Sequence, residues 1–198
     1  MDKSKFYTVM KTNNIEIDYD VFEYALYILK QYFSFLLISS IIALYFGILP
    51  NLLFFILFFI PLRTCIGGLH FNKKYTCLLF SFITSLFIAY SSYHINFGTL
   101  YFKIGLMGCY IIITFFVKPT DHFNKRVSEE DKLKFKKNSI LILFSYSCLL
   151  IVFEFLHVIS LSNLLILTSG LSTINNCVAK FLLTYINKED RGHENNYL

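Results

Sequence analysis

Long apolar runs alternate with short polar segments along this chain of 198 residues. A helix needs about 20 apolar residues to cross the ~30 Å hydrocarbon core of a bilayer. Six runs qualify by their composition, although one is short, and they fall at about residues 32–49, 52–62, 77–97, 100–117, 139–159 and 161–186. The pattern predicts an all-α, polytopic membrane protein with six transmembrane helices in a single domain, 1–198.

The composition supports this class. Hydrophobic residues make up 56% of the chain and charged residues only 16%. A soluble domain of this size could not bury so much apolar surface, because most of its residues lie near its exterior. The cysteines are odd in number and scattered, with no Cys-x-x-Cys pair, so we expect neither a disulfide framework nor a metal site, and no cofactor.

The first segment, 1–31, has a polar start followed by apolar positions at roughly helical spacing over 15–30. Acidic residues interrupt the apolar core that a cleavable signal peptide would need. We predict an amphipathic helix on the inner membrane surface that runs into the first span. The alternative is that this segment is simply the beginning of the first span.

The second run, 52–62, is unusually short. Eleven helical residues cover only about 17 Å, and Pro61 is expected to disfavour continuation of the helix. The glycine-rich stretch after it is therefore predicted to begin inside the bilayer boundary, where protein or a watery cavity must cover irregular backbone.

The basic residues predict the orientation. Of the 18 Lys and Arg, all but Lys103 fall near the two termini, in the 63–74 stretch or in the 118–138 loop. By the positive-inside rule, both termini and these two loops are cytoplasmic. The net charge of +5 therefore reports orientation rather than binding to nucleic acid.

Several polar residues within the runs are expected to have structural roles. Lys103 lies near the outer end of the fourth run, where it can snorkel to the interface, and Glu154 is close enough to the same side to reach the headgroups. The small residues at 169–173 favour close helix packing, with Asn175 and Asn176 as hydrogen-bonding groups between helices.

The stretch 63–77 contains the residues that are candidates for catalysis. Cys77 lies where a loop becomes the third span, and a thiolate is favoured at a helix amino terminus near basic groups. His70 is the natural base. Seven helical residues would separate the two Cα atoms by about 10 Å, so His70 must lie on a loop that folds back. Gly67 and Gly68 permit such a turn and can offer backbone N–H groups to an oxyanion.

Spacing alone leaves alternatives open. Cys65 is a rival nucleophile without a helix start behind it, and the remaining cysteines are expected to be packing residues. Asn72 and Asp121 are candidates to orient His70, and a dyad without a third residue is also possible.

Arg63, Gly67-Gly68, His70 and Cys77, set between the second and third of six spans, resemble the accessory gene regulator B (AgrB) family. The resemblance covers nearly the whole chain in length, span number and loop charge, whereas the motif covers only 63–77. It implies a membrane-embedded cysteine endopeptidase of Gram-positive bacteria, with His70 and Cys77 as the catalytic dyad at the cytoplasmic side and Arg63 and Gly68 needed for activity.

The resemblance also implies the substrate and partners. A short AgrD-like propeptide would be cut by Cys77, and the resulting thioester would be attacked by a Cys or Ser of the peptide, which gives a cyclic thiolactone or lactone for quorum sensing. A homodimer is implied. The acidic end of the propeptide would bind the 118–138 loop, whose basic residues also contact anionic lipid and include Lys125, Arg126, Lys132, Lys134, Lys136 and Lys137. The competing interpretations are a small transporter or export component and a non-catalytic membrane scaffold.

Overall fold

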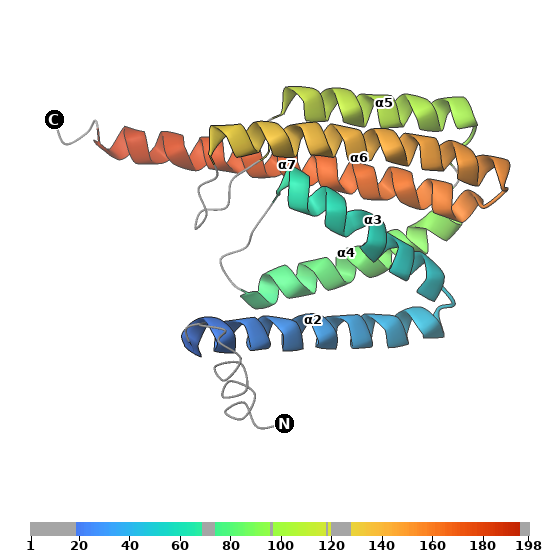
Figure 1. Ribbon diagram of the computed structural model, residues 1–198, viewed down its shortest axis with the longest axis horizontal. Coiled ribbons are helices and arrows are strands. Elements are labelled where there is room, and N and C mark those ends of the chain that lie inside the picture. The colour runs from blue at the N-terminus through green and yellow to red at the C-terminus, as the bar shows by residue number, and fades with distance from the viewer. Residues whose placement is uncertain (1–18, 69–73, 96, 118, 120–127, 195–198) are drawn as a thin grey trace, which may run out of the picture. The chain divides into compact units, whose positions relative to one another are not determined.

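The computed structural model describes residues 19–68, 74–95, 97–117, 119 and 128–194. Within these ranges the protein is all-helical. The helices are α2 (Tyr19–Tyr45), α3 (Leu49–Ile66), α4 (Lys74–His94), α5 (Leu100–Phe116), α6 (Glu129–Phe155) and α7 (Ile159–Glu194), as drawn in Figure 1. The chain divides into two compact units, Met1–Ile42 and Ala43–Leu198. The second unit contains α3 to α7 and the whole of the 63–77 motif.

Helix α2 is continuous from Tyr19 to Tyr45, without a boundary near residue 31. The described part of this segment therefore runs without a break into the first long helix, which both interpretations of the sequence expect. Residues 1–18 lie outside the described ranges.

Four helices are long and apolar enough to cross a membrane, judged by length and composition: Val21–Tyr45, Leu49–Ile66, Tyr75–His94 and Glu130–Phe155. The apolar helix Leu100–Phe116 is shorter. Large side chains such as Leu57, Ile83, Ile112 and Phe144 are exposed on four different helices of the second unit. Apolar exposure on this scale fits a protein whose surroundings are lipid.

The second run was predicted to form a short helix over 52–62, and this length was wrong. Helix α3 continues through Pro61 to Ile66 and spans 18 residues, about 27 Å at 1.5 Å per residue. A proline within a membrane helix is tolerated where neighbouring groups satisfy the backbone. Pro61 lacks the N–H that would bond the Leu57 carbonyl. Close to this position, the Thr64 hydroxyl donates to the Pro61 carbonyl at 2.9 Å, and the Tyr146 hydroxyl of α6 donates to the Phe58 carbonyl at 2.8 Å. The glycine pair therefore follows a helix of nearly full membrane length.

Helix α6 also begins earlier than predicted, at Glu129 rather than near 139. Ser128 caps it: its hydroxyl oxygen accepts from the Asp131 N–H at 3.2 Å. The last ten residues of the basic loop are therefore helical.

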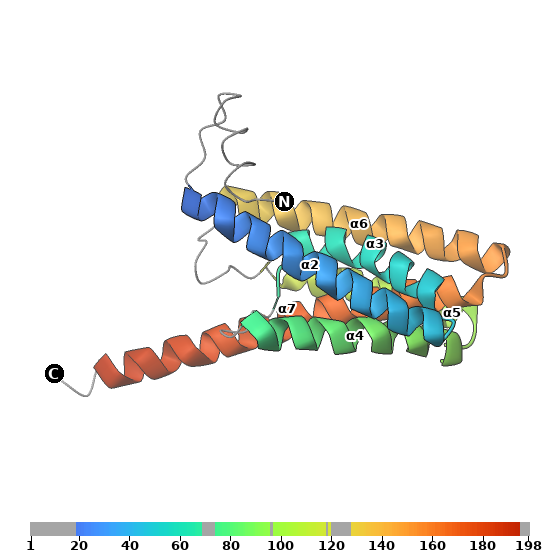
Figure 2. The same ribbon diagram turned by 90° about the horizontal axis from the view of Figure 1, so that it is seen from below.

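Helix α7 is the centre of the second unit, because it contacts α3, α4, α5 and α6 (Figures 1 and 2). Its buried positions include Leu164, Leu165 and Ile166, but also many Ser, Thr and Asn side chains. These polar side chains are buried against protein, so α7 can contain more polar residues than a helix whose side chains face lipid. Gly170 confirms the predicted close packing, since a Cβ there would lie 2.8 Å from the Tyr110 hydroxyl of α5.

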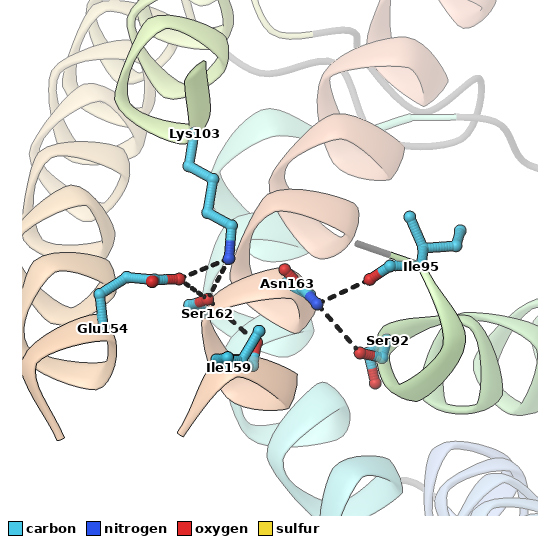
Figure 3. A network of polar contacts seen from close by, with 7 residues as sticks. All are labelled: Ser92, Ile95, Lys103, Glu154, Ile159, Ser162 and Asn163. Carbon is cyan, nitrogen blue, oxygen red and sulfur yellow. Dashed lines mark hydrogen bonds and ion pairs between the residues drawn. The ribbon is translucent and has the colours of Figure 1, made fainter. Parts of the chain in front are cut away.

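A buried polar network joins helices near the start of α7 (Figure 3). Lys103 of α5 forms an ion pair with Glu154 of α6, and its ammonium also donates to the Ser162 hydroxyl of α7 at 2.9 Å. The Ser162 hydroxyl donates in turn to the Glu154 carboxylate. Lys103 is only 1% exposed, so the prediction that it snorkels to the interface was wrong. It lies inside the helix bundle, where Glu154 balances its charge.

Beside this network, Asn163 connects α7 to the end of α4. Its side-chain amide donates to the carbonyls of Ser92 at 3.3 Å and Ile95 at 2.8 Å. Asn51 of α3 donates to the Ser92 hydroxyl at 2.6 Å. Polar contacts thus fix α3, α4 and α7 to one another at this end of the unit.

Candidate functional site

Arg63 and Gly67 form a closed turn at the carboxy-terminal end of α3. The Gly67 N–H donates to the Arg63 carbonyl at 3.1 Å, and the Arg63 guanidinium donates to the Gly67 carbonyl at 3.0 Å. Gly67 has φ 77° and ψ −148°, a conformation that essentially only glycine adopts. Both glycines of the motif are needed for this turn, because Gly68 follows with φ 139°.

Gly68 is buried beneath the Arg63 side chain. A Cβ at Gly68 would lie 1.9 Å from Arg63 Nη1 and 3.5 Å from the Asn175 Cβ of α7. Such an approach to Nη1 is impossible without displacing the guanidinium. The structure therefore brings Arg63 and Gly68 of the motif close to Asn175 of α7, which the sequence analysis had assigned only to hydrogen bonding between helices.

Cys77 lies in the first turn of α4, the fourth residue of the helix, and is partly buried. The amino terminus of a helix favours negative charge because its N–H dipoles point outward. Cys65 is also partly buried but lies in the last turn of α3, at the negative end of that helix. The structure thus places the two candidate nucleophiles at helix ends of opposite polarity.

His70 and Asn72 lie outside the described residues, as do Asp121, Lys125 and Arg126. Among the described residues, no group of three or more His, Cys, Asp and Glu is placed to hold a metal ion.

Four basic residues of the predicted substrate-binding set lie in the first turns of α6. The Lys136 ammonium lies over the Phe115 ring of α5, 4.6 Å from its centroid. Lys134 lies 3.5 Å from the Asp131 carboxylate, a pair in which both side chains are well exposed. Lys132 is partly exposed and Lys137 exposed. Of the two lysines with these contacts, Lys134 is therefore partly neutralised, whereas Lys136 faces an aromatic ring.

The second unit defines the class of protein: a bundle of apolar helices around a polar central helix, with a glycine turn ahead of a cysteine at a helix start. Residues 4–176 match the family described as Accessory gene regulator B. The chain belongs to this family. No curated protein and no solved structure matches the chain. Members of the family act in agr quorum sensing, where they process a peptide and work with an AgrD propeptide.

The geometry of the turn makes Gly68→Ala a specific test. The new methyl group must displace the Arg63 guanidinium from the Gly67 carbonyl, and alanine is strained at φ 139°. We expect peptide processing to fall about 100-fold, the effect of a displacement of about 1 Å near reacting groups. The measurement is the rate of propeptide cleavage per molecule of folded protein in the membrane.

Gly108→Ala is the matched control for this substitution. Gly108 lies in α5 with nothing within 4 Å of its would-be Cβ, so processing should be unchanged. Processing by Gly68→Ala at the level of Gly108→Ala would contradict a role for this turn.

Proposed function

We propose that this protein is a membrane cysteine endopeptidase that removes the carboxy-terminal part of a short AgrD-like propeptide and promotes cyclisation of the remainder. Family membership and the position of Cys77 in the first turn of α4 support this proposal. His70 serves as the base, while Arg63, Gly67 and Gly68 hold the turn that leads to it.

The first step forms an acyl-enzyme. His70 takes the proton of the Cys77 thiol, and the thiolate attacks the carbonyl carbon of the scissile peptide bond. The Gly67 N–H is already occupied by the Arg63 carbonyl, so Gly68 is the member of the pair that is left to offer an N–H to the oxyanion. Collapse of the tetrahedral intermediate breaks the C–N bond. His70 returns its proton to the leaving amine, and a thioester joins Cys77 to the amino-terminal part of the propeptide.

The second step closes the ring. A Cys thiol or Ser hydroxyl within the bound peptide attacks the thioester carbonyl and passes its proton to His70. The C–S bond to Cys77 breaks, which regenerates the thiolate and releases a thiolactone or lactone. A site beside the bilayer favours this outcome over hydrolysis, because it limits the access of water to the thioester.

The membrane arrangement is part of the proposal. Six spans place both termini, the 63–77 stretch and the basic loop on the cytoplasmic side of a Gram-positive cell membrane, and two copies form a homodimer. In this arrangement α5 and α7 are the remaining spans beside the four longer apolar helices. The buried polar residues of α7 fit a span that faces other helices rather than lipid.

The direct test is co-expression with the AgrD-type propeptide, followed by mass measurement of the released fragments. We expect a carboxy-terminal fragment and a cyclic product one water lighter than its linear form. A propeptide that remains intact while the protein is folded in the membrane would contradict the proposed activity.

The lysines at the start of α6 give a second prediction. Replacing Lys132, Lys136 and Lys137 by Gln should raise KM for the propeptide and leave kcat unchanged. Exposed ion pairs contribute about 0.2–1 kcal/mol each, so losing three should raise KM roughly 3- to 150-fold. The measurement is steady-state cleavage in liposomes over a range of propeptide concentrations.

A propeptide with a neutralised acidic tail is the matched control for the lysine variant. With this substrate, wild type and the lysine variant should have the same KM. An unchanged KM for the acidic propeptide, or a fall in kcat alone, would show that these lysines do not bind the substrate.

A further inference from the structure

Helix α4, which carries Cys77, is buried against its neighbours only in its second half. No residue from 75 to 84 is buried. Figure 1 agrees, because α4 lies against the other helices at its His94 end and lies apart from α7 at its Lys74 end. The buried residues of α4 all belong to the later stretch and are Ser85, Ile88, Ala89, Ser91 and Ser92. The position of Cys77 is therefore decided near the opposite end of its helix.

Two asparagines from other helices hold this second half. The Asn163 side-chain amide of α7 donates to the carbonyls of Ser92 at 3.3 Å and Ile95 at 2.8 Å (Figure 3). Asn51 of α3 donates to the Ser92 hydroxyl at 2.6 Å. Asn51, Ser92 and Asn163 are at most 2% exposed, and hydrogen bonds are electrostatically stronger in such a low-dielectric interior. We call these three residues the polar clamp of α4.

Helix α4 transmits the orientation of the polar clamp to Cys77. The helix contains neither proline nor glycine, the residues that most often kink a helix. Cys77 and Ser92 are 15 positions apart, about 22 Å along a helix. A tilt of only about 3° at the clamp therefore moves Cys77 by roughly 1 Å. A displacement of that size can lower the rate of a reaction about 100-fold.

We infer that the polar clamp positions the nucleophile: Asn51 and Asn163 hold Ser92, and α4 thereby holds Cys77 where it meets the propeptide. The inference rests on the proposed function, in which Cys77 is the nucleophile. The clamp acts through the helix, since it lies too far from Cys77 to contact the reacting atoms. Asn163 Oδ1 has no hydrogen-bond partner among the described residues, which is costly for a buried acceptor. The Asn163 amide is nevertheless oriented so that its donor bonds go to the end of α4.

The first test is steady-state cleavage of the AgrD-type propeptide by the full-length protein in liposomes. Asn163→Leu keeps a side chain of similar size and removes both bonds to α4, whereas Ser92→Ala removes the acceptor for Asn51. We expect kcat per folded molecule to fall about 10- to 100-fold in Asn163→Leu and less in Ser92→Ala, which loses one bond. KM should stay unchanged, because neither substitution alters the lysines of α6 that are proposed to bind the propeptide.

Ser85→Ala is the matched control for Ser92→Ala. Both serines are buried in α4 and donate within that helix, Ser85 to the Phe82 carbonyl at 2.9 Å and Ser92 to the Ala89 carbonyl at 2.8 Å. Ser92 in addition accepts the bond from α3. The kcat and KM of Ser85→Ala should therefore equal those of wild type.

The second test measures the position of the start of α4 and does not depend on activity. Nitroxide labels are attached to p-acetylphenylalanine at positions 75 and 174, which leaves the native cysteines unlabelled. Tyr75 and Ile174 are 77% and 61% exposed, so labels at these positions do not enter the core. A release of about 10° at the clamp moves position 75 by roughly 4 Å. In pulsed electron paramagnetic resonance, the distance distribution should shift or broaden in both clamp variants and stay unchanged in Ser85→Ala.

The outcomes separate this inference from the proposed function. Wild-type kcat in both clamp variants, together with loss of cleavage in Cys77→Ala, overturns only the role of the clamp. A lower kcat at unchanged label distances, or a raised KM at constant kcat, also overturns that role, because these results indicate altered packing or substrate binding. Cleavage that persists in Cys77→Ala overturns the proposed function and the positioning role with it. If Asn163→Leu does not fold, Ser92→Ala decides by the same criteria.

Discussion

Cys77→Ala is expected to abolish propeptide cleavage, while Cys65→Ala retains it. Removal of the nucleophile from an enzyme of this kind lowers kcat by about 10⁶-fold, which is below detection in a co-expression assay. Cys65 lies at the carboxy-terminal end of α3, whereas Cys77 lies in the first turn of α4. The measurement is the mass of the released propeptide fragments, compared among wild type and the two variants at equal amounts of protein in the membrane.

Cys65→Ala is a matched control because both cysteines are partly buried and belong to the same stretch of sequence. If Cys65→Ala abolished cleavage and Cys77→Ala did not, the assignment of the nucleophile would be reversed. Cleavage by both variants would exclude a mechanism that depends on either thiolate alone.

The second large effect is expected from Glu154→Gln, and it concerns stability rather than chemistry. The substitution leaves the Lys103 ammonium, which is 1% exposed, without its counter-charge. Breaking a buried ion pair by removing one partner costs about 3–5 kcal/mol. The lower end applies here, because the Glu154 side chain is 19% exposed. We expect a marked loss of folded protein after heating in detergent, measured by size-exclusion chromatography.

Two further variants test the origin of this loss. Lys103→Met should be milder, because it leaves the more exposed partner of the pair, still bonded to Ser162. The double variant Lys103→Met/Glu154→Gln should be more stable than Glu154→Gln, since no unpaired charge remains buried. Equal stability of Glu154→Gln and wild type would show that the pair does not stabilise the bundle.

Much of the helical framework could be predicted from apolar runs and turn residues. The run at 100–117 matches α5, Leu100–Phe116, closely, because the turn at 96–99 and the polar loop after 117 delimit it. Pro61 was misleading, since a local rule about proline cannot include the Tyr146 hydroxyl that bonds to α3 from α6. The start of α6 was missed because its first turns are charged, although Ser128 with Glu129 and Asp131 is a recognisable helix start.

The motif residues were found from the sequence, but their neighbours were not. Gly67 and Gly68 predicted a turn, and the structure describes one with positive φ at both positions. The Asn175 Cβ lies 3.5 Å from the position of a Cβ on Gly68, and this proximity of residues more than 100 positions apart is one that no local pattern can indicate. Lys103 and Glu154 were likewise assigned separately to the interface, because pairing between α5 and α6 depends on how the helices pack.

The central claim is that Cys77 forms a thioester with the propeptide, and trapping that species is the most direct test. The propeptide carries Ala in place of its internal Cys or Ser, so the ring cannot close, and the protein is denatured in acid and digested for mass spectrometry. We predict that the peptide containing Cys77 gains the mass of the amino-terminal part of the propeptide and loses it on treatment with hydroxylamine. An unmodified Cys77 peptide, in a sample that has released the carboxy-terminal fragment, would contradict this mechanism.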